Sequence, residues 1–184
     1  MAWLTRSTLS AAATLVAVTA VTSGPGWGQE QAAHSGDEVA LQAIRLQAEI
    51  DRQLQLSPGG TQISHNQIAW RDGHVVMTFL TDSKSIFGPR CPSGQFCVFE
   101  DRDWGGRRML QFSDCNPSGR FVDLAWYGFN DETSSWHNRS AALVDVYNWA
   151  GFEQFLWRSE PGARSSWVGS VNNDRADHLF LYCQ

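Results

Sequence analysis

Two hydrophobic periodicities divide the chain. Over residues 37–56, apolar side chains recur at spacings of three and four, which places Val39, Ala43, Leu46, Ile50 and Leu54 on one face of an amphipathic helix. Ser35 and Glu38 have the spacing of a capping box, and residues 58–60, Pro-Gly-Gly, end the pattern. Two apolar runs, residues 66–70 and 74–79, then flank Arg-Asp-Gly, a sequence typical of a β-hairpin turn.

From Cys91 onward, short aromatic and β-branched runs alternate with Gly, Asn, Asp and Ser clusters. This texture predicts strands at residues 95–100, 108–112, 142–147, 152–157 and 178–182. We therefore expect an all-β domain over 91–184, arranged as a Greek-key sandwich. The helix and hairpin of residues 37–80 are too small to be stable alone, so they pack on this domain or serve as a pro-segment. Residues 81–90 are interpreted as the linker.

The N-terminus predicts export. Residues 1–23 combine one early arginine with a small, apolar, acid-free run that is short for a membrane span. We interpret them as a signal peptide, with an anchoring helix as the alternative, and residues 24–36 as a flexible leader. The protein is then secreted and extracellular, with no membrane association after signal removal. The net charge of −5, with Lys84 as the single lysine, offers no basic patch for nucleic acid.

Four cysteines follow the signal: Cys91, Cys97, Cys115 and Cys183. An even count in an exported chain favours two disulfides, with three possible pairings, and a zinc site is the weaker alternative because no CxxC pair exists. Cys91 and Cys115 bracket the first predicted hairpin of the β domain. We therefore predict that these two pair, which leaves Cys97 with Cys183.

The β domain contains a degenerate internal repeat. Phe99, Trp104 and Gly106 have the same spacing as Tyr147, Phe152 and Gln154, with glutamine in place of glycine the second time. A polar corner follows each: Asn130–Ser135 (NDETSS) and Asn173–His178 (NDRADH). Two such units facing one another would close a sandwich.

These motifs resemble the two Greek-key signatures of βγ-crystallins. The wider arrangement, CPSGQFCVFEDRDWGGRRMLQFSDC, YGFNDETSSW and PGARSSWVG, resembles secreted actinomycete peptidase inhibitors related to the metalloproteinase inhibitor of Streptomyces. The resemblance extends into the helix and hairpin before Cys91. It implies a βγ-crystallin-like double Greek-key sandwich, preceded by a small helix-plus-hairpin segment.

The resemblance also implies that calcium binds where the two corners exchange oxygen ligands. The candidate ligands are Asn130, Asp131, Glu132, Ser134, Asn173, Asp174, Arg175 and Asp177. Ser135 would instead tie the first corner to the hairpin after Phe99. In the second corner Asp177 and His178 replace the expected hydroxyl residues. The alternative is a pair of turn clusters whose side chains cap their own backbone.

No catalytic constellation is evident, so we predict a protein that is not an enzyme. Two functions from different classes fit. The first is a monomeric inhibitor of an extracellular protease, of the thermolysin-like metalloprotease class by resemblance, acting through a rigid loop. Candidate loops are residues 115–126 and 165–171, with apolar anchors Phe121, Val122, Leu124, Trp167 and Val168. The second is a calcium-binding extracellular structural or binding module without inhibitory activity; a carbohydrate-binding module that uses exposed tryptophans is a weaker third.

Overall fold

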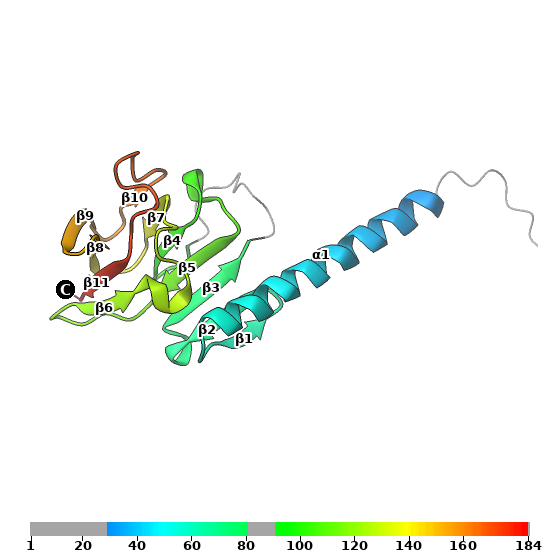
Figure 1. Cartoon of the computed structure of the whole chain (residues 1–184), viewed down its shortest axis with the longest axis horizontal. Coiled ribbons are helices and arrows are strands. Elements are labelled where there is room, and N and C mark those ends of the chain that lie inside the picture. The colour runs from blue at the N-terminus through cyan, green and yellow to red at the C-terminus, as the bar shows by residue number, and fades with distance from the viewer. Residues whose placement is uncertain (1–28, 81–90, 184) are drawn as a thin grey trace, which may run out of the picture. The chain divides into compact units, whose positions relative to one another are not determined.

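The computed structural model describes residues 29–80 and 91–183 (Figure 1). The predicted signal peptide, the linker and the first part of the leader therefore lie outside the described residues. Residues 39–184 form one compact unit. The elements before Cys91 are α1 (Gln29–Leu56), β1 (Thr61–Ser64), β2 (Gln67–Trp70), the 3-10 turn η1 (Arg71–Gly73) and β3 (Val75–Phe79). After Cys91 come β4 (Phe96–Phe99), η2 (Arg102–Trp104), β5 (Arg108–Phe112), β6 (Arg120–Asp123), η3 (Leu124–Tyr127), β7 (Ser135–Asn138), β8 (Leu143–Trp149), β9 (Glu153–Ser159), β10 (Arg164–Ser165) and β11 (His178–Tyr182).

The strands after Cys91 form two antiparallel sheets with the topology of a double Greek key. One sheet contains β5-β4-β7-β10 and the other β6-β11-β8-β9 (Figure 1). The first repeat supplies β4 to β7 and the second β8 to β11. Each repeat therefore places its third strand, β6 or β10, in the sheet of the other. This exchange confirms the all-β, βγ-crystallin-like sandwich and ties the two halves into one fold.

The hairpin before Cys91 continues the first sheet. β3 pairs with β5 along Val75–Phe79, so the full strand order is β1-β2-β3-β5-β4-β7-β10. The hairpin is confirmed, and its turn at Arg71, Asp72 and Gly73 has positive φ at each residue. Residues 61–79 are thus part of the sandwich.

Helix α1 packs against the added strands through its C-terminal half. Ile50 is fully buried and shares the main core with Ile68 and Met77, whereas Val39 on the same predicted stripe is 66% exposed. The apolar stripe therefore contacts the sheet only near its end. The helix begins at Gln29, so the predicted start at residue 37 was wrong, and Ser35 lies inside the helix and is not its cap. None of the described helices is long and apolar enough to cross a membrane.

The disulfide pairing differs from the prediction. Cys91 bonds Cys97, and Cys115 bonds Cys183. The chain before β4 turns toward the β7 side, where the Gly94 amide donates to a carbonyl beyond β7. After β5, the chain crosses to the other sheet and pairs with the end of β11. The cysteines that bracket the hairpin therefore leave it in opposite directions.

Candidate functional site

The two polar corners meet across a local pseudo-twofold. The Asp131 amide donates to the Ala176 carbonyl at 3.0 Å, and the Asp174 amide donates to the Thr133 carbonyl at 3.2 Å. The second residue of each corner thus bonds the fourth residue of the other. Asp131 and Asp174 also share the left-handed backbone, with φ of 57° and 54°. The predicted meeting of the acidic corners is confirmed.

The first corner is tethered as the resemblance implied. The Ser135 hydroxyl donates to the Asp101 carbonyl at 2.6 Å and accepts from the Trp104 amide at 3.1 Å. The Ser134 amide donates to the Phe99 carbonyl at 2.9 Å. These bonds hold the corner against the folded hairpin between β4 and β5.

The second corner reaches its hairpin by a different residue. The Asp177 carboxylate accepts from the Trp149 amide at 2.6 Å, so it takes the tethering role of Ser135. His178 points to the other side of β11, where its Nε2 lies 2.9 Å from Glu153 Oε1. Its ring stacks on Tyr147 at 5.4 Å with 6° between the planes. The departures from the motif therefore move the tether by one residue and leave the hairpin contact intact.

Oxygen atoms converge at the first corner. The Ser134 hydroxyl donates to Asp174 Oδ1 at 3.3 Å, across the two repeats. Ser134, Asp174 and Glu132 line a cavity of about 680 Å³, and Asp101 and Asn173 are also part of its lining. Burial raises the pKa of Asp131, and the negative charge of Asp177 raises it further. Asp177 does not line this cavity, so the fit to a metal depends on the chemistry of the lining groups: the Ser134 hydroxyl and the carboxylates of Glu132 and Asp174 are oxygen donors of the kind that a hard metal ion such as Ca²⁺ prefers.

The second corner fits such an ion less well. One Asp177 oxygen is used by the Trp149 amide, and the Arg175 guanidinium donates to Gln154 Oε1 at 2.6 Å and to the Val171 carbonyl. Over residues 29–80 and 91–183, no three His, Cys, Asp or Glu side chains gather closely enough to hold a metal by themselves. An ion at the second corner would therefore need carbonyl and hydroxyl ligands, as in the first corner.

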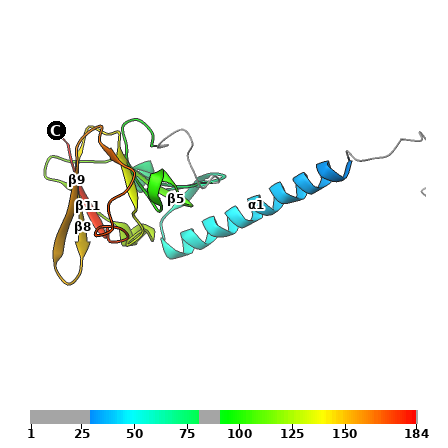
Figure 2. The ribbon, with the colours of Figure 1, turned by 90° about the horizontal axis from the view of Figure 1, so that it is seen from above.

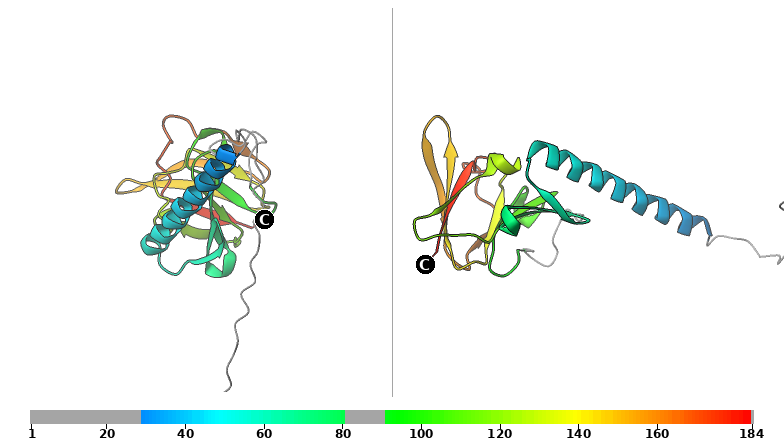
Figure 3. Two further views of the ribbon diagram at one scale, coloured as in Figure 1. Left: turned by 90° about the vertical axis from the view of Figure 1, so that its right-hand side faces the viewer. Right: turned by 90° about the horizontal axis from the view of Figure 1, so that it is seen from below.

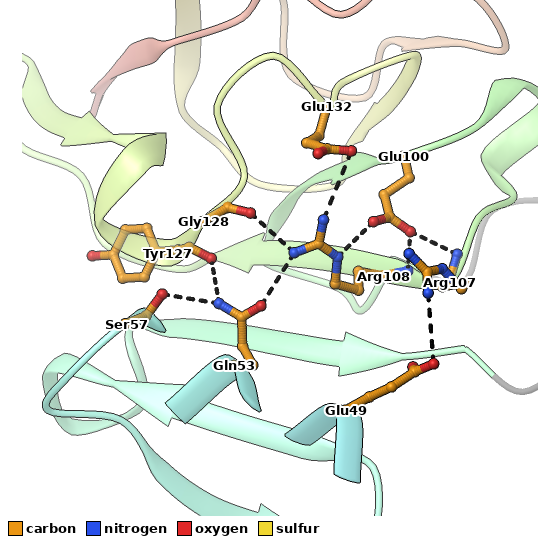
Figure 4. Close-up of polar contacts among 9 residues, drawn as sticks. All are labelled: Glu49, Gln53, Ser57, Glu100, Arg107, Arg108, Tyr127, Gly128 and Glu132. Atoms are coloured by element: carbon orange, nitrogen blue, oxygen red, sulfur yellow. Dashed lines mark hydrogen bonds and ion pairs between the residues drawn. The ribbon is translucent and has the colours of Figure 1, made fainter. Parts of the chain in front are cut away.

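A buried ion pair that the sequence did not reveal supports the first corner (Figure 4). Arg108 Nε lies 2.5 Å from Glu100 Oε1, and these side chains are only 15% and 9% exposed. Charged residues surround Glu100 and Arg108 in sequence, a pattern typical of a solvated surface, so the burial of this pair is a finding of the structure. Arg108 also donates to the Gly128 carbonyl at 2.9 Å and to Gln53 Oε1 at 3.1 Å, so it joins α1 to the chain that leads into the corner.

The predicted contact loop at residues 165–171 is exposed and held at several points. The Val168 amide donates to the Ser134 carbonyl at 3.0 Å, which ties the loop to the first corner. The Arg102 guanidinium lies 3.8 Å over the Trp167 ring, and Trp167 Nε1 donates to Asn173 Oδ1 at 3.2 Å. Val171 projects from the end of the loop with 72% of its surface exposed.

The other predicted loop, residues 115–126, offers fewer anchors than expected. Val122 is 2% exposed and Leu124 is fully buried, so both belong to the core and cannot contact a partner. Val122 lies in β6, a strand that the sequence analysis did not identify. Phe121 points away from the core and is 41% exposed.

Comparison with known proteins gives one family match. Residues 88–159 match the model of peptidase inhibitor family I36. No curated protein matches the chain.

Solved structures similar to this chain are βγ-crystallin domains. One, from work on the evolution of the eye lens βγ-crystallin domain fold, is 14% identical, covers 54% of this chain and 95% of its own, and has a TM-score of 0.42. A βγ-crystallin domain from Clostridium beijerinckii is 23% identical, covers 48% of this chain and 97% of its own, and has a TM-score of 0.36. At these scores the fold assignment rests on the strand exchange described above. The family match and this topology together support a βγ-crystallin-like peptidase inhibitor family for this chain.

Proposed function

We propose that this protein is a secreted inhibitor of thermolysin-like metalloproteases that presents residues 165–171 to the protease cleft. The match to peptidase inhibitor family I36 supports an inhibitor with a protease partner. Two disulfides are compatible with an extracellular location. We choose residues 165–171 because this loop is both exposed and held in place by hydrogen bonds.

The restraint matters because a loop that is ordered before binding loses less conformational entropy in the complex. Residues 165–171 are anchored at both ends of the exposed stretch. The Asp103 amide donates to the Ser166 carbonyl at 2.8 Å, and the Asn173 amide donates to the Gly169 carbonyl at 3.0 Å. Trp167 lies between the two bonded carbonyls, and Val171 lies in the turn that the Asn173–Gly169 bond closes; both offer exposed apolar surface. Thermolysin-like proteases favour an apolar residue after the scissile bond, and Val171 is the most exposed apolar side chain of the loop.

The test is a titration of thermolysin with the purified protein and with Val171→Asp. Val171 is exposed, so this change leaves the core intact, and we expect inhibition to weaken by about tenfold or more as a charge enters an apolar subsite. Val39→Asp is the matched control, because Val39 is also an exposed valine but lies on α1. Equal inhibition by Val171→Asp and the unchanged protein would exclude this loop. Absence of inhibition by the unchanged protein at micromolar concentration would exclude the proposed target class.

The second candidate is a calcium-binding extracellular module, and the Ser134–Asp174 contact between the repeats favours it. Ca²⁺ would be held by the Ser134 hydroxyl, the Asp174 carboxylate and oxygen atoms of Glu132. An ion that binds only the folded chain stabilises it by about 2.7 kcal/mol at a hundred times its Kd. Calorimetry in Ca²⁺ and in EGTA should therefore show a higher unfolding temperature with the ion, and Asp174→Asn should remove the difference. Equal unfolding temperatures in both buffers would rule out this candidate.

A further inference from the structure

The outer face of the second sheet is lined with aromatic rings. Phe180 on β11 lies 5.3 Å from Phe121 on β6 and 5.8 Å from Tyr147 on β8, centroid to centroid. The residues that alternate with them, such as Val146 and Leu179, point into the core and are fully buried. Since an antiparallel sheet normally presents polar side chains to water, this aromatic outer face is unusual.

The face ends in a projecting hairpin and an open cavity. The β8–β9 hairpin extends beyond the rest of the sandwich, as Figures 2 and 3 show. Trp149, at the end of β8, is 62% exposed. Trp149 and Phe121 line a cavity of about 450 Å³, which has room for one long side chain. The side chains of Asp123, Glu153, Asp177 and His178 line the same cavity.

Each carboxylate is fixed through one oxygen. Asp123 Oδ1 accepts from the Ala125 amide at 2.9 Å, Asp177 Oδ2 accepts from the Trp149 amide, and Glu153 Oε1 contacts His178. Within the described residues, no hydrogen bond uses the second oxygen of any of the three. None of the described residues that line the cavity is lysine or arginine. The cavity is therefore strongly acidic and retains oxygen atoms free to accept hydrogen bonds.

From this charge and shape we propose that the cavity binds an arginine side chain of a partner peptide or protein. A guanidinium group is planar, stacks on aromatic faces and donates to carboxylates in pairs. The molecule already uses both contacts elsewhere: Arg102 lies over Trp167 at 3.8 Å, and Arg158 bonds Asp145 through two nitrogens at 2.6 and 2.7 Å. The cavity offers the same two kinds of contact, and among its described lining residues His178, already paired with Glu153, is the one basic side chain.

The test is calorimetric titration of the full-length mature protein with an acetylated, amidated peptide of alternating glycine and arginine. The matched peptide replaces arginine by citrulline, which keeps the shape and removes the charge. We expect the arginine peptide to bind at least about tenfold more tightly, and its affinity to fall as salt is added. Equal affinity for the two peptides, no binding of either, or binding of a neutral chito-oligosaccharide in place of the arginine peptide would overturn the proposal.

Variants locate the site. Asp123→Asn combined with Glu153→Gln removes two charges while keeping the side-chain shape, and asparagine still caps the Ala125 amide. We expect affinity for the arginine peptide to fall at least about fivefold. Glu160→Gln removes an exposed charge outside the cavity and should leave affinity within about twofold. An equal effect of both changes would contradict the assignment.

A second pair of variants tests the aromatic side of the cavity. Trp149→Leu should weaken binding about threefold to tenfold through loss of ring stacking. Phe152→Leu, on the same hairpin and 61% exposed but outside the cavity lining, should not. Thermolysin inhibition measured on the same variants separates the two proposals, because the cavity variants leave residues 165–171 unchanged. Loss of peptide binding with inhibition retained supports two sites, and unchanged peptide binding in Trp149→Leu would refute this one.

Discussion

Arg108→Met tests how strongly the buried ion pair holds α1 on the sandwich. Removing one partner of a buried pair costs about 3–5 kcal/mol, because the other charge stays buried without a counter-ion. Glu100 keeps two backbone donors, the amides of Arg107 and Arg108 at 2.7 Å each, and these lower the cost. Loss of the bonds to the Gly128 carbonyl and Gln53 adds about 1 kcal/mol each. We expect the free energy of unfolding to fall by about 3–5 kcal/mol, a large part of the stability of an ordinary domain.

The assay is urea unfolding followed by tryptophan fluorescence and by far-UV circular dichroism, so that loss of the sandwich and of the helix are both recorded. Arg107→Met is the control, because its side chain is 74% exposed and lies 3.6 Å from Glu49. An exposed pair of this kind contributes about 0–1 kcal/mol. The double change Glu100→Gln with Arg108→Met should recover part of the loss. Equal shifts of the unfolding midpoint for Arg107→Met and Arg108→Met would refute the reasoning.

Two further predictions concern pH and the disulfides. Burial, followed by the charges of Arg139 and Arg164, lowers the pKa of His137 in the folded protein. The neutral ring therefore contributes its full stability above the ordinary pKa of 6.5, and this contribution is lost as the pH falls from 6.5 through the pKa of the folded state. His137→Gln should therefore lose less stability than the unchanged protein between pH 7.5 and 5 in urea titrations, and an equal loss would contradict this. The Cys115–Cys183 bridge spans 68 positions and the Cys91–Cys97 bridge spans six. Replacing both cysteines of the long bridge by serine should lower the free energy of unfolding by about 4 kcal/mol, against about 2 kcal/mol for the short bridge. Thermal unfolding measures both, and a larger cost for the short bridge would count against loop closure as the cause.

The sequence predicted the strands whose own residues alternate or form apolar runs. β4, β5, β8, β9 and β11 all fall within one or two residues of the predicted ranges. β1, β6, β7 and β10 were missed because they are short, two to four residues each, and β6 and β10 pair only with strands of the other repeat. The position of β6 and β10 depends on the strand exchange, which local patterns do not record.

In the candidate site, too, the sequence predicted some contacts and missed those that depend on the tertiary fold. The meeting of the two corners and the Ser135 tether followed from the resemblance to βγ-crystallin motifs. The tether by Asp177 did not, because nothing local distinguishes a carboxylate that binds a backbone amide from one that could face a metal. Local sequence does not predict the burial of the Glu100–Arg108 pair, because charged residues surround it, whereas in the fold Arg108 lies opposite Phe79 of β3 and contacts Gln53 of α1. The disulfide prediction failed for a related reason, since it assumed that the chain continues straight from each end of the hairpin.

The pairing of β3 with β5 has a consequence for how the sandwich would behave without its N-terminal segment. β5, RMLQF, is buried over four of its five residues. Stripped of β3, it would present a row of unsatisfied amides and carbonyls beside apolar side chains, a template for adding a strand from another molecule. When β1 to β3 are present, the edge strand on this side of the sheet is β1, which is short, polar and interrupted by an irregularity between Gln62 and Ser64. We therefore expect the segment before Cys91 to oppose edge-to-edge self-association of the sandwich.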